Sequence, residues 1–431
     1  MADSRPSARN LAVVGAGYVG LTTAACLSWM GHRVVCSDID EQRIDGLQRG
    51  EVPILEPRLG ELLSAGLGSK RLRFVTDSAA AASGADFVFL CVPTPGNSAG
   101  GADMSFLEAA VGAVRDSLRP GAVLVNKSTA PPGSAAALAR MLQRGDVAVA
   151  SNPEFLRQGS AVEDFLEPDR VVVGADERAA ARRVAELYAS VDAPVLITDA
   201  ASAESIKYAA NAFLAVKLTY ANSVAALCEA VGADVDDVLA GMGLDGRIGA
   251  NYLQPGPGWG GSCLPKDTLA LIGASAEAGY DFALLRSVVA ANEAQLERIV
   301  GKVAGRVALQ GARIALLGLA FKAGTDDSRD SPAMEIARRL SRAGAVVSAY
   351  DPAISGSPAT REAGIAIAAD AYQACHGANA LVLATQWPEF EKLDFDRVAR
   401  LMADLHVIDA RNCLDREALE QRGFSYSGVG R

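Results

Sequence analysis

The chain has 431 residues, of which 50% are hydrophobic, and a net charge of −10, so it can form two or three domains with cores of their own. The acidic balance argues against nucleic acid or an anionic membrane surface as a partner, and no stretch approaches the roughly 18–20 consecutive apolar residues of a membrane helix. Seven cysteines and only three histidines, with no CxxC pair, indicate reduced thiols in a cytoplasmic protein without a metal site.

The N-terminal segment lacks the apolar core of a signal peptide and leads directly into an alternation of strands and helices. Short β-branched runs are separated by helix-length segments up to residue 199, which is the pattern of a parallel sheet with helices on its faces. The runs are LAVVG, RVVCSD, FVFLCV, AVLVNKS, VAVASNPEF, RVVVG and PVLIT. The sequence therefore predicts a first doubly wound domain over residues 1–199.

The region 200–303 is predicted to be mainly helical. It begins with one continuous helical pattern, and more helix follows on either side of a Gly/Pro-rich loop. So long a helix suits a spine that buries its apolar face against a partner subunit, although packing within the chain explains it equally well.

From residue 304 to 431 the first pattern returns. The segments ARIALLGLAFKAGT, SPAMEIARRLSRAG and AVVSAYDP repeat the order of strand, glycine-bearing loop, helix and strand with an acidic end. The predicted fold class is therefore α/β, with two Rossmann-like doubly wound domains joined by a long central helical region.

Three glycines between the first strand and the first helix form a GxGxxG pattern, GAGYVG, with Gly15, Gly17 and Gly20. They permit a tight turn and let a pyrophosphate approach the helix N-terminus. Asp38 ends the next strand, where a carboxylate can bind both adenosine ribose hydroxyls and repel a 2′-phosphate, so NAD is favoured over NADP. Arg43 is close in sequence and could host a phosphate instead. The alternative is a purely structural glycine turn.

Two further loops follow strand ends on the same side of the predicted sheet. Residues 92–95 include Pro93 and Thr94, and residues 127–133 include Ser128 and Thr129. Ligands bind at the carboxyl ends of strands in such sheets. Hydroxyls on proline-stiffened turns could line a cofactor, although such loops are by themselves more often only turns.

Glu204, Lys207 and Asn211 fall on one face of the long helix, at spacings of three and four. A solvent-exposed stripe is the usual explanation, but the same face continues through Leu214 and Leu218 and becomes apolar. A lysine and an amide that enter a buried cleft are good donors to an oxyanion. The pattern therefore favours a functional role.

Cys263 stands at the predicted start of a helix, after a loop with four glycines and two prolines, PGPGWGGSC. A helix N-terminus and the neighbouring Lys266 both lower the pKa of a thiol, and the thiolate is the nucleophile. The glycines would let a substrate approach the backbone closely, and Asp267 could orient Cys263 or a water. The alternative is a buried structural cysteine beside a flexible loop.

Taken together, these segments resemble the UDP-glucose/GDP-mannose dehydrogenase family over essentially the whole chain. The motifs occur in the family's order: GAGYVG, SDID, VPTP, KSTAPPG, NPEFL, KYAANAFLA, GRIGANYLQPGPGWGGSCLPKD, GLAFKAGTDDSRDSP and IDAR. The cysteine block is highly specific, whereas the glycine pattern alone is not. The resemblance implies NAD as cofactor, a nucleotide sugar as substrate, and a homodimer or higher homo-oligomer.

The resemblance also implies roles for matching residues. For catalysis it implies that Cys263 is the nucleophile and that Lys207 and Asn211 donate to an oxyanion. It also implies that Asp267 and Thr129 handle the proton and water, and that Glu154 is an acid/base group. The residues implied in cofactor binding are Gly15, Gly17, Tyr18, Val19, Gly20, Asp38, Arg43, Pro93, Thr94, Ser128, Thr129, Gln158, Lys266 and Arg329. Those implied in substrate binding are Glu154, Phe155, Leu156, Lys207, Asn211, Arg247, Tyr252, Gln254, Gly260, Lys322 and Arg411.

Two of these positions carry a further implication. Arg247 resembles the family's arginine that reaches into the neighbouring subunit's site. Gln158 departs from the family, which usually has Glu there, near the nicotinamide ribose. A neutral amide at that position is expected to weaken or retune cofactor binding without removing the chemistry of Cys263.

The implied reaction is the four-electron oxidation of UDP-glucose to UDP-glucuronate, through a thiohemiacetal and a thioester on Cys263, with two NADH per acid formed. The stretches RIGANYLQPG and EPDRVVVG resemble the UDP-glucose branch more than the GDP-mannose branch. Three alternatives stay open. They are the same chemistry on GDP-mannose or a UDP-N-acetylhexosamine, a two-electron β-hydroxyacid dehydrogenase, and a non-catalytic NAD-responsive binding protein.

Overall fold

The computed structural model describes residues 8–96, 101–356 and 358–431. The contacts within the chain divide it into two compact units. The first contains Met1–Ala210 and Leu269–Gly279, and the second contains Asn211–Thr268 and Tyr280–Arg431. The expectation about a signal peptide rests in part on residues 1–7, which lie outside the described residues.

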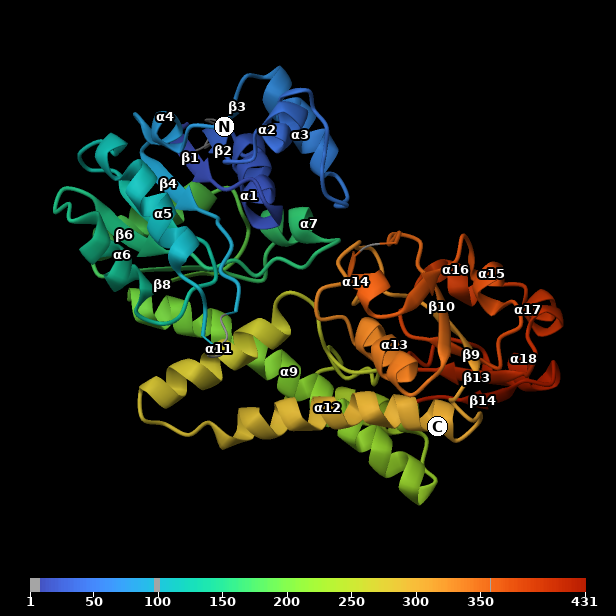
Figure 1. Ribbon diagram of the computed structural model, residues 1–431. Helices are drawn as coiled ribbons and strands as arrows, with labels where there is room; N and C mark the ends of the chain where they lie inside the picture. The colour runs from blue at the N-terminus through green and yellow to red at the C-terminus, as the bar shows by residue number, and fades with distance from the viewer. Residues whose placement is uncertain (1–7, 97–100, 357) are drawn as a thin grey trace. The chain divides into compact units, whose positions relative to one another are not determined.

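The first unit is built on an eight-stranded sheet (Figure 1) in the order β3-β2-β1-β4-β5-β6-β7-β8. Neighbouring strands are parallel except β6 and β7, which are antiparallel. The strands are β1 (Asn10–Val14), β2 (Arg33–Ser37), β3 (Leu72–Val75), β4 (Phe87–Leu90), β5 (Val123–Asn126), β6 (Ala148–Ser151), β7 (Val171–Ala175) and β8 (Val195–Thr198). The parallel order of the first six strands confirms the predicted doubly wound sheet.

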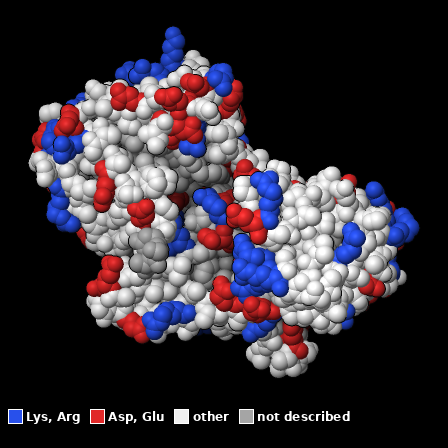
Figure 2. Space-filling model, in the orientation of Figure 1, with Lys and Arg blue, Asp and Glu red and all other residues white. Residues whose placement is uncertain are grey.

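Helices cover both faces of this sheet because successive side chains of a strand point to opposite faces. Leu11 and Val13 of β1 pack in a core with α1, α3, α7 and α8, whereas Ala12 and Val14 pack in a second core with α4, α5 and α6. The helices are α1 (Tyr18–Trp29), α2 (Glu41–Gln48), α3 (Leu59–Gly68), α4 (Ser78–Ala82), α5 (Ser105–Val114), α6 (Ser134–Leu142), α7 (Ala161–Leu166) and α8 (Arg178–Ala185). Acidic and basic side chains are interspersed on the face of this unit that Figure 2 shows.

The second unit contains a six-stranded, wholly parallel sheet in the order β11-β10-β9-β12-β13-β14. The strands are β9 (Arg313–Leu317), β10 (Val346–Tyr350), β11 (Ile365–Ile367), β12 (Ala380–Leu383), β13 (His406–Asp409) and β14 (Ser425–Ser427). Its helices are α10 (Val235–Gly243), α12 (Ala283–Ala304), α13 (Pro332–Arg342), α14 (Pro358–Glu362), α15 (Ala371–Cys375), α16 (Pro388–Glu391), α17 (Phe395–Leu401) and α18 (Arg416–Gln421). This order confirms the second doubly wound domain.

The two sheets share one local device. In the first, Asp38 follows β2 and accepts the backbone N–H of Ala16 at 2.7 Å. In the second, Asp351 follows β10 and accepts the N–H groups of Leu319 and Ala320 at 2.7 and 3.0 Å. Each carboxylate thus holds the loop after the first strand of its sheet, which explains the repeated acidic strand end in the sequence.

Two helices pass from one unit into the other, namely α9 (Ala200–Val231) and α11 (Leu264–Glu277). Among the described residues, α9 alone is long and apolar enough, by length and composition, to cross a membrane. It is nevertheless not a run of roughly 18–20 consecutive apolar residues, because Glu204, Lys207, Lys217 and Glu229 interrupt it. Ala203, Tyr208 and Ala215 are buried within the protein, but only 33% of the apolar window is buried. One such helix is by itself weak evidence for a membrane.

Candidate functional site

The glycine loop between β1 and α1 leaves room for a ligand. A Cβ on Gly20 would lie 1.9 Å from the carbonyl oxygen of Gly15, and one on Gly15 would lie 2.4 Å from that of Cys91, so both glycines are required by the protein's own packing. A Cβ on Gly17 would meet no atom within 4 Å. Gly17 is the N-cap residue of α1 and supplies no side-chain cap. An uncapped helix N-terminus beside an open glycine fits the pyrophosphate of a dinucleotide.

Asp38 lies beside this loop in a position to select the cofactor. Its Oδ2 accepts from Ala16 N–H at 2.7 Å and from Arg43 Nη1 at 3.2 Å, and its Oδ1 accepts from Asp40 N–H at 3.0 Å. Because Arg43 is paired with Asp38, the ion pair opposes its use as a host for a 2′-phosphate. The arrangement favours NAD, as the sequence predicted.

The loops at 92–95 and 127–133 come together, but their hydroxyls act differently from the expectation. Thr94 Oγ1 donates to the carbonyl of Thr129 at 2.7 Å, and Ser128 Oγ lies 2.8 Å from the carbonyl of Val92. Both side chains are buried. Because the hydroxyl hydrogens of Thr94 and Ser128 are used between the loops, the two hydroxyl groups can serve a cofactor only as acceptors. Pro93, which precedes Thr94, is exposed.

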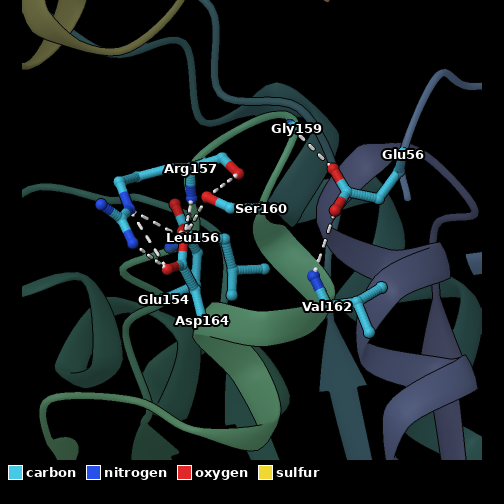
Figure 3. A network of polar contacts seen from close by, with 8 residues as sticks. All are labelled: Glu56, Glu154, Leu156, Arg157, Gly159, Ser160, Val162 and Asp164. Atoms are coloured by element: carbon cyan, nitrogen blue, oxygen red, sulfur yellow. Dashed lines mark hydrogen bonds and ion pairs between the residues drawn. The ribbon is translucent and has the colours of Figure 1, made fainter. Parts of the chain in front are cut away.

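Lys207 and Glu154 form a buried ion pair in the first unit. Lys207 Nζ lies 3.0 Å from Glu154 Oε1, and the two side chains are 4% and 6% exposed. Glu154 Oε2 accepts the backbone N–H of Leu156 at 2.6 Å (Figure 3). The ring of Phe155 is 5.5 Å from Lys207 Nζ. A small pocket lined by Thr129 and Lys207, among others, lies at this place.

Glu204, on the same helix face, faces the protein and not a substrate. Its carboxylate accepts the N–H groups of Gly133 and Ala135 at 2.7 and 2.8 Å, and Ser151 Oγ donates to it at 2.8 Å. Burial raises the pKa of Glu204 in spite of these hydrogen bonds. The carboxylate therefore fastens α9 to the start of α6 and the end of β6.

Cys263 caps the first turn of α11 in the second unit. Its carbonyl accepts Asp267 N–H at 2.9 Å, and its side chain is exposed. The alternative of a buried structural cysteine is therefore excluded for this residue, whereas Cys26, Cys36, Cys91, Cys228 and Cys375 are buried.

The glycines before Cys263 have a different physical reason from the one expected. A Cβ on Gly260 would lie 2.0 Å from the carbonyl oxygen of Asp330, and one on Gly261 would lie 2.7 Å from the ring of Phe321. These glycines are needed for the close packing of the loop against the 321–332 segment. Packing alone therefore requires Gly260 and Gly261 to be glycine, and their role in substrate approach stays a prediction.

Asp267 joins two of the predicted residues. Its buried carboxylate accepts from Asn211 Nδ2 at 2.6 Å and from Lys266 Nζ at 2.6 Å. The ammonium of Lys266, which the sequence placed beside the thiol, is thus paired with Asp267. Asn211 and Asp267 are brought together as one hydrogen-bonded pair.

Arg329 interacts electrostatically with Cys263. The pKa of Arg329 is raised mainly by the hydrogen bonds to Asp327 and to a smaller extent by the interaction with Cys263. Arg329 Nε and Nη2 lie 2.8 and 2.6 Å from Asp327 oxygens. The sequence assigned Arg329 to the cofactor and did not anticipate this interaction.

The remaining predicted substrate residues of the second unit differ in how far they are held by the protein itself. Arg411 is tied into the fold, since Nε donates to the Ala384 carbonyl at 2.8 Å and Nη2 to the Phe321 carbonyl at 3.2 Å, and burial lowers its pKa to about 10. Lys322 Nζ lies 5.8 Å from the Phe321 ring. The others are at the surface or partly so: Arg247, Tyr252 and Gln254.

The structure therefore assembles the predicted residues into two groups, one in each unit. The first unit holds the glycine loop, Asp38, Arg43, the two loops with hydroxyls, residues 154–158 and Lys207. The second holds Asn211, the 252–263 loop, Asp267, Lys322, Arg329 and Arg411. Lys207 and Asn211 lie one turn apart on the single helix α9.

Family models match three successive parts of the chain. The NAD binding domain of the UDP-glucose/GDP-mannose dehydrogenase family matches residues 9–192, its central domain 201–294 and its UDP binding domain 315–416. The chain is 42% identical to UDP-glucose 6-dehydrogenase of Rhizobium meliloti (strain 1021), over 98% of this chain and 99% of the relative. It is 41% identical to UDP-glucose 6-dehydrogenase TuaD of Bacillus subtilis (strain 168), over 98% and 93%.

Solved structures are similar over the same length. A UDP-glucose dehydrogenase from Pyrobaculum islandicum has a TM-score of 0.91 and 37% identity, covering 100% of this chain and 99% of that one. A UDP-D-ManNAc dehydrogenase from Pyrococcus horikoshii has a TM-score of 0.88 and 30% identity, covering 98% and 99%. With all three family domains matched in order, the chain belongs to the UDP-glucose/GDP-mannose dehydrogenase family.

Proposed function

We propose that the chain oxidises the primary alcohol of UDP-glucose to the carboxylate of UDP-glucuronate, with NAD as oxidant and Cys263 as nucleophile. The observation that carries the proposal is the exposed thiol at the first turn of α11, beside the electrostatic influence of Arg329. Relatives named UDP-glucose 6-dehydrogenase support the choice of sugar. A similar structure named for UDP-D-ManNAc makes a UDP-N-acetylhexosamine the second candidate substrate.

The residues of the first unit fit NAD. Gly17 leaves the space for a pyrophosphate and Asp38 supplies acceptors for the adenosine ribose. Bound NAD would accept one hydride in each of two oxidations. We assign to its binding also Tyr18, Val19, Pro93, Thr94, Ser128, Thr129, Gln158, Lys266 and Arg329.

In the first oxidation the alcohol loses a hydride from carbon and a proton from oxygen. The Glu154 carboxylate accepts that proton as the acid/base group, and Lys207 Nζ, which lies 3.0 Å from Glu154 Oε1, stays the donor to the oxygen. The product is an aldehyde. Phe155 and Leu156, which continue the chain from Glu154, are assigned to the substrate.

In the second oxidation the Cys263 thiolate adds to the aldehyde carbon and a C–S bond forms. Lys207 and Asn211 donate to the resulting oxyanion. Loss of the second hydride restores the carbonyl as a thioester. Water then attacks the thioester carbon with help from Asp267, Glu154 and Thr129, the C–S bond breaks, and the carboxylate leaves while the sulfur returns as a thiolate. The covalent bond keeps the aldehyde from escaping between the two oxidations.

The test is an NADH-release assay across UDP-glucose, UDP-N-acetylhexosamines and GDP-mannose, with product acid counted in parallel. We expect two NADH per acid and the highest kcat/KM on UDP-glucose. Cys263→Ser should abolish turnover while NAD binding persists. A ratio of one NADH per product would point to a two-electron dehydrogenase, and full activity of Cys263→Ser would rule out the covalent route.

We also propose that the chain is a homodimer through α9. Phe213, Tyr220, Leu227 and Val231 are each more than half exposed and recur at helical spacing along that helix. Exposed apolar stripes of this kind mark interfaces. Tyr220→Asp should shift the mass in light scattering from dimer to monomer, and an unchanged mass would exclude this face.

Arg247 is assigned to the neighbouring subunit's site in that dimer. Its side chain is 89% exposed and pairs only with the adjacent Asp245 among the ion pairs of the described residues. Mixing the inactive variants Arg247→Ala and Cys263→Ser should restore activity, because the hybrid dimer has one complete site. No recovery after subunit exchange would place Arg247 in its own chain's site.

The domain division 1–199, 200–303 and 304–431 and the cytoplasmic location remain proposals. The free thiols of all seven cysteines support a reducing compartment. Limited proteolysis should cut near residues 199 and 303, and cell fractionation would reveal a membrane-bound chain if α9 were inserted.

A further inference from the structure

Three carboxylates hold one short turn of the first unit, residues 156–160 (Figure 3). Leu156 N–H donates to Glu154 at 2.6 Å, Arg157 N–H to Asp164 at 2.7 Å, and Gly159 N–H to Glu56 at 2.8 Å. Hydrogen bonds to a charged acceptor are about twice as strong as neutral ones. The turn that carries Gln158 and follows Glu154 is therefore held from three directions.

Glu56 is the member of this set that comes from far away in the chain. It precedes α3, whereas Gly159 is 103 residues later. Its Oε1 also accepts Val162 N–H at 3.3 Å, at the start of α7. The side chain is 7% exposed, so water has little access to replace a lost partner.

The same carboxylate is tied to the glycine loop. Tyr18, the first residue of α1, donates its hydroxyl to Glu56 Oε2, and the Tyr18 oxygen itself lies 2.8 Å from Gly159 N. Burial and the hydrogen bond to Glu56 raise the pKa of Tyr18, so the phenol stays protonated and remains a donor. Glu56 thus joins the helix start that faces the cofactor space to the turn after Glu154.

We propose that Glu56 is a positioning residue, which holds the turn 156–160 against the start of α1 and thereby fixes the carboxylate of Glu154. Four residues connect the two carboxylates, because Glu154 accepts the backbone N–H of Leu156 and Glu56 accepts that of Gly159. The catalytic consequence rests on the proposed function of Glu154. The structural consequence does not.

Glu56→Gln is the decisive variant, because it keeps the shape and removes one acceptor. Glu56 receives donors on both oxygens, so an amide nitrogen must face either Val162 N–H or the pair of Gly159 N–H and Tyr18. Amide hydrogen exchange of the ligand-free protein should then speed up about tenfold at Gly159 or Val162 and also at Leu156 and Arg157. In turnover, kcat should fall about tenfold with little change in KM.

Asp77→Asn is the matched control. Asp77 lies in the same unit and caps α4 by accepting Ala79 N–H at 2.9 Å and Ala80 N–H at 3.1 Å. Among the hydrogen bonds of the described residues, none joins Asp77 to the turn 156–160. The Asp77→Asn variant should lose stability at the start of α4. Its amide exchange at Leu156 and Arg157 should stay unchanged, and so should its kcat. Tyr18→Phe, which removes one donor to Glu56 and keeps the carboxylate, should give a smaller effect of the same pattern if Glu56→Gln does not fold.

The outcomes separate the two ideas. Unchanged exchange at Leu156 and Arg157 in folded Glu56→Gln overturns the positioning role. Faster exchange there with unchanged kcat upholds the positioning of the turn and shows that turnover does not depend on it.

Discussion

The ammonium of Lys207 and the carboxylate of Glu154 are 3.0 Å apart and almost completely buried. Breaking a buried pair by removing one partner leaves an uncompensated charge, which costs about 3–5 kcal/mol. We expect Lys207→Met and Glu154→Gln each to destabilise the first unit by about this amount. The double variant should regain much of the loss. Urea unfolding of the four proteins in a double-mutant cycle measures the coupling, and simple additivity would contradict it.

Gly17 and Gly20 should respond in opposite ways to alanine. Gly20→Ala places a Cβ on the Gly15 carbonyl, so it should lower the free energy of unfolding by about 1–3 kcal/mol. Gly17 has φ −75° and free space around its Cα, so alanine there should leave stability within about 1 kcal/mol. NAD affinity measured by calorimetry should nevertheless fall about tenfold or more in Gly17→Ala. Equal stability losses in both would contradict this reading of the loop.

Asp38→Asn should narrow the preference for NAD over NADP. The change removes the negative charge that opposes a 2′-phosphate and weakens the hold on Arg43, which is 3.2 Å from Asp38. We expect the ratio of the two dissociation constants to move toward NADP by about tenfold. Titration of the variant with NAD and with NADP measures this ratio. Asp40→Asn, which keeps Asp38, is the control. The same ratio in both variants would show that Asp38 is not the selector.

Lys127 should make stability depend on pH. It is buried, and desolvation lowers its pKa from 10.5 to about 8. Between these two pKa values Lys127 is protonated in the unfolded chain but not in the folded chain, so the free energy of unfolding rises with pH in that window. Below the window the folded protein must bury the charged ammonium, which destabilises it. The difference corresponds to about 3 kcal/mol.

Lys127→Met, which removes the titration, provides the comparison. The groups that act on Lys127 are Cys26, Cys91, Glu154 and Lys207, with the hydroxyl of Tyr188 at 3.5 Å. The stability of the native chain relative to Lys127→Met should improve from about pH 8 to pH 10.5, the window set by the two pKa values. A difference that stays constant with pH would place the pKa of Lys127 outside this range.

Arg329→Gln should slow the reaction of Cys263 with iodoacetamide at neutral pH. The guanidinium and the thiolate attract each other, so removing the cation disfavours the reactive anion. A decrease of about threefold or more is expected. Arg306→Gln removes an exposed cation from the same unit and should leave the rate unchanged. Equal rates in the two variants would remove Arg329 from the environment of the thiol.

Much of the fold follows from local patterns. The β-branched runs predicted every strand of the first sheet except β3, but only β9 and β10 of the second sheet. The glycine loop with Asp38 marked the first crossover, because strand, turn and helix signals are local in sequence. The antiparallel pairing of β6 with β7 was not predicted, since the direction of a strand depends on the path of the chain between strands.

The site was predicted as a set of residues but not as a set of contacts. Lys207, Asn211, Cys263 and Asp267 were found from their motifs. The pairing of Lys266 with Asp267 and the packing role of Gly260 were not, because both depend on which segments meet in the folded unit. Glu56 gave no signal at all, since its partners lie 38 to 106 residues away.

The continuity of α9 has a consequence for insertions and deletions. Lys207 and Asn211 share a face only because three residues separate them in an unbroken helix. One residue added or lost between them would turn Asn211 by about 100° and move it about 1.5 Å along the axis. Lys207, which pairs with Glu154, and Asn211, which donates to Asp267, would then no longer share one helix face. Changes of length should therefore be absent from this turn in functional relatives, whereas the surface loops are free to vary.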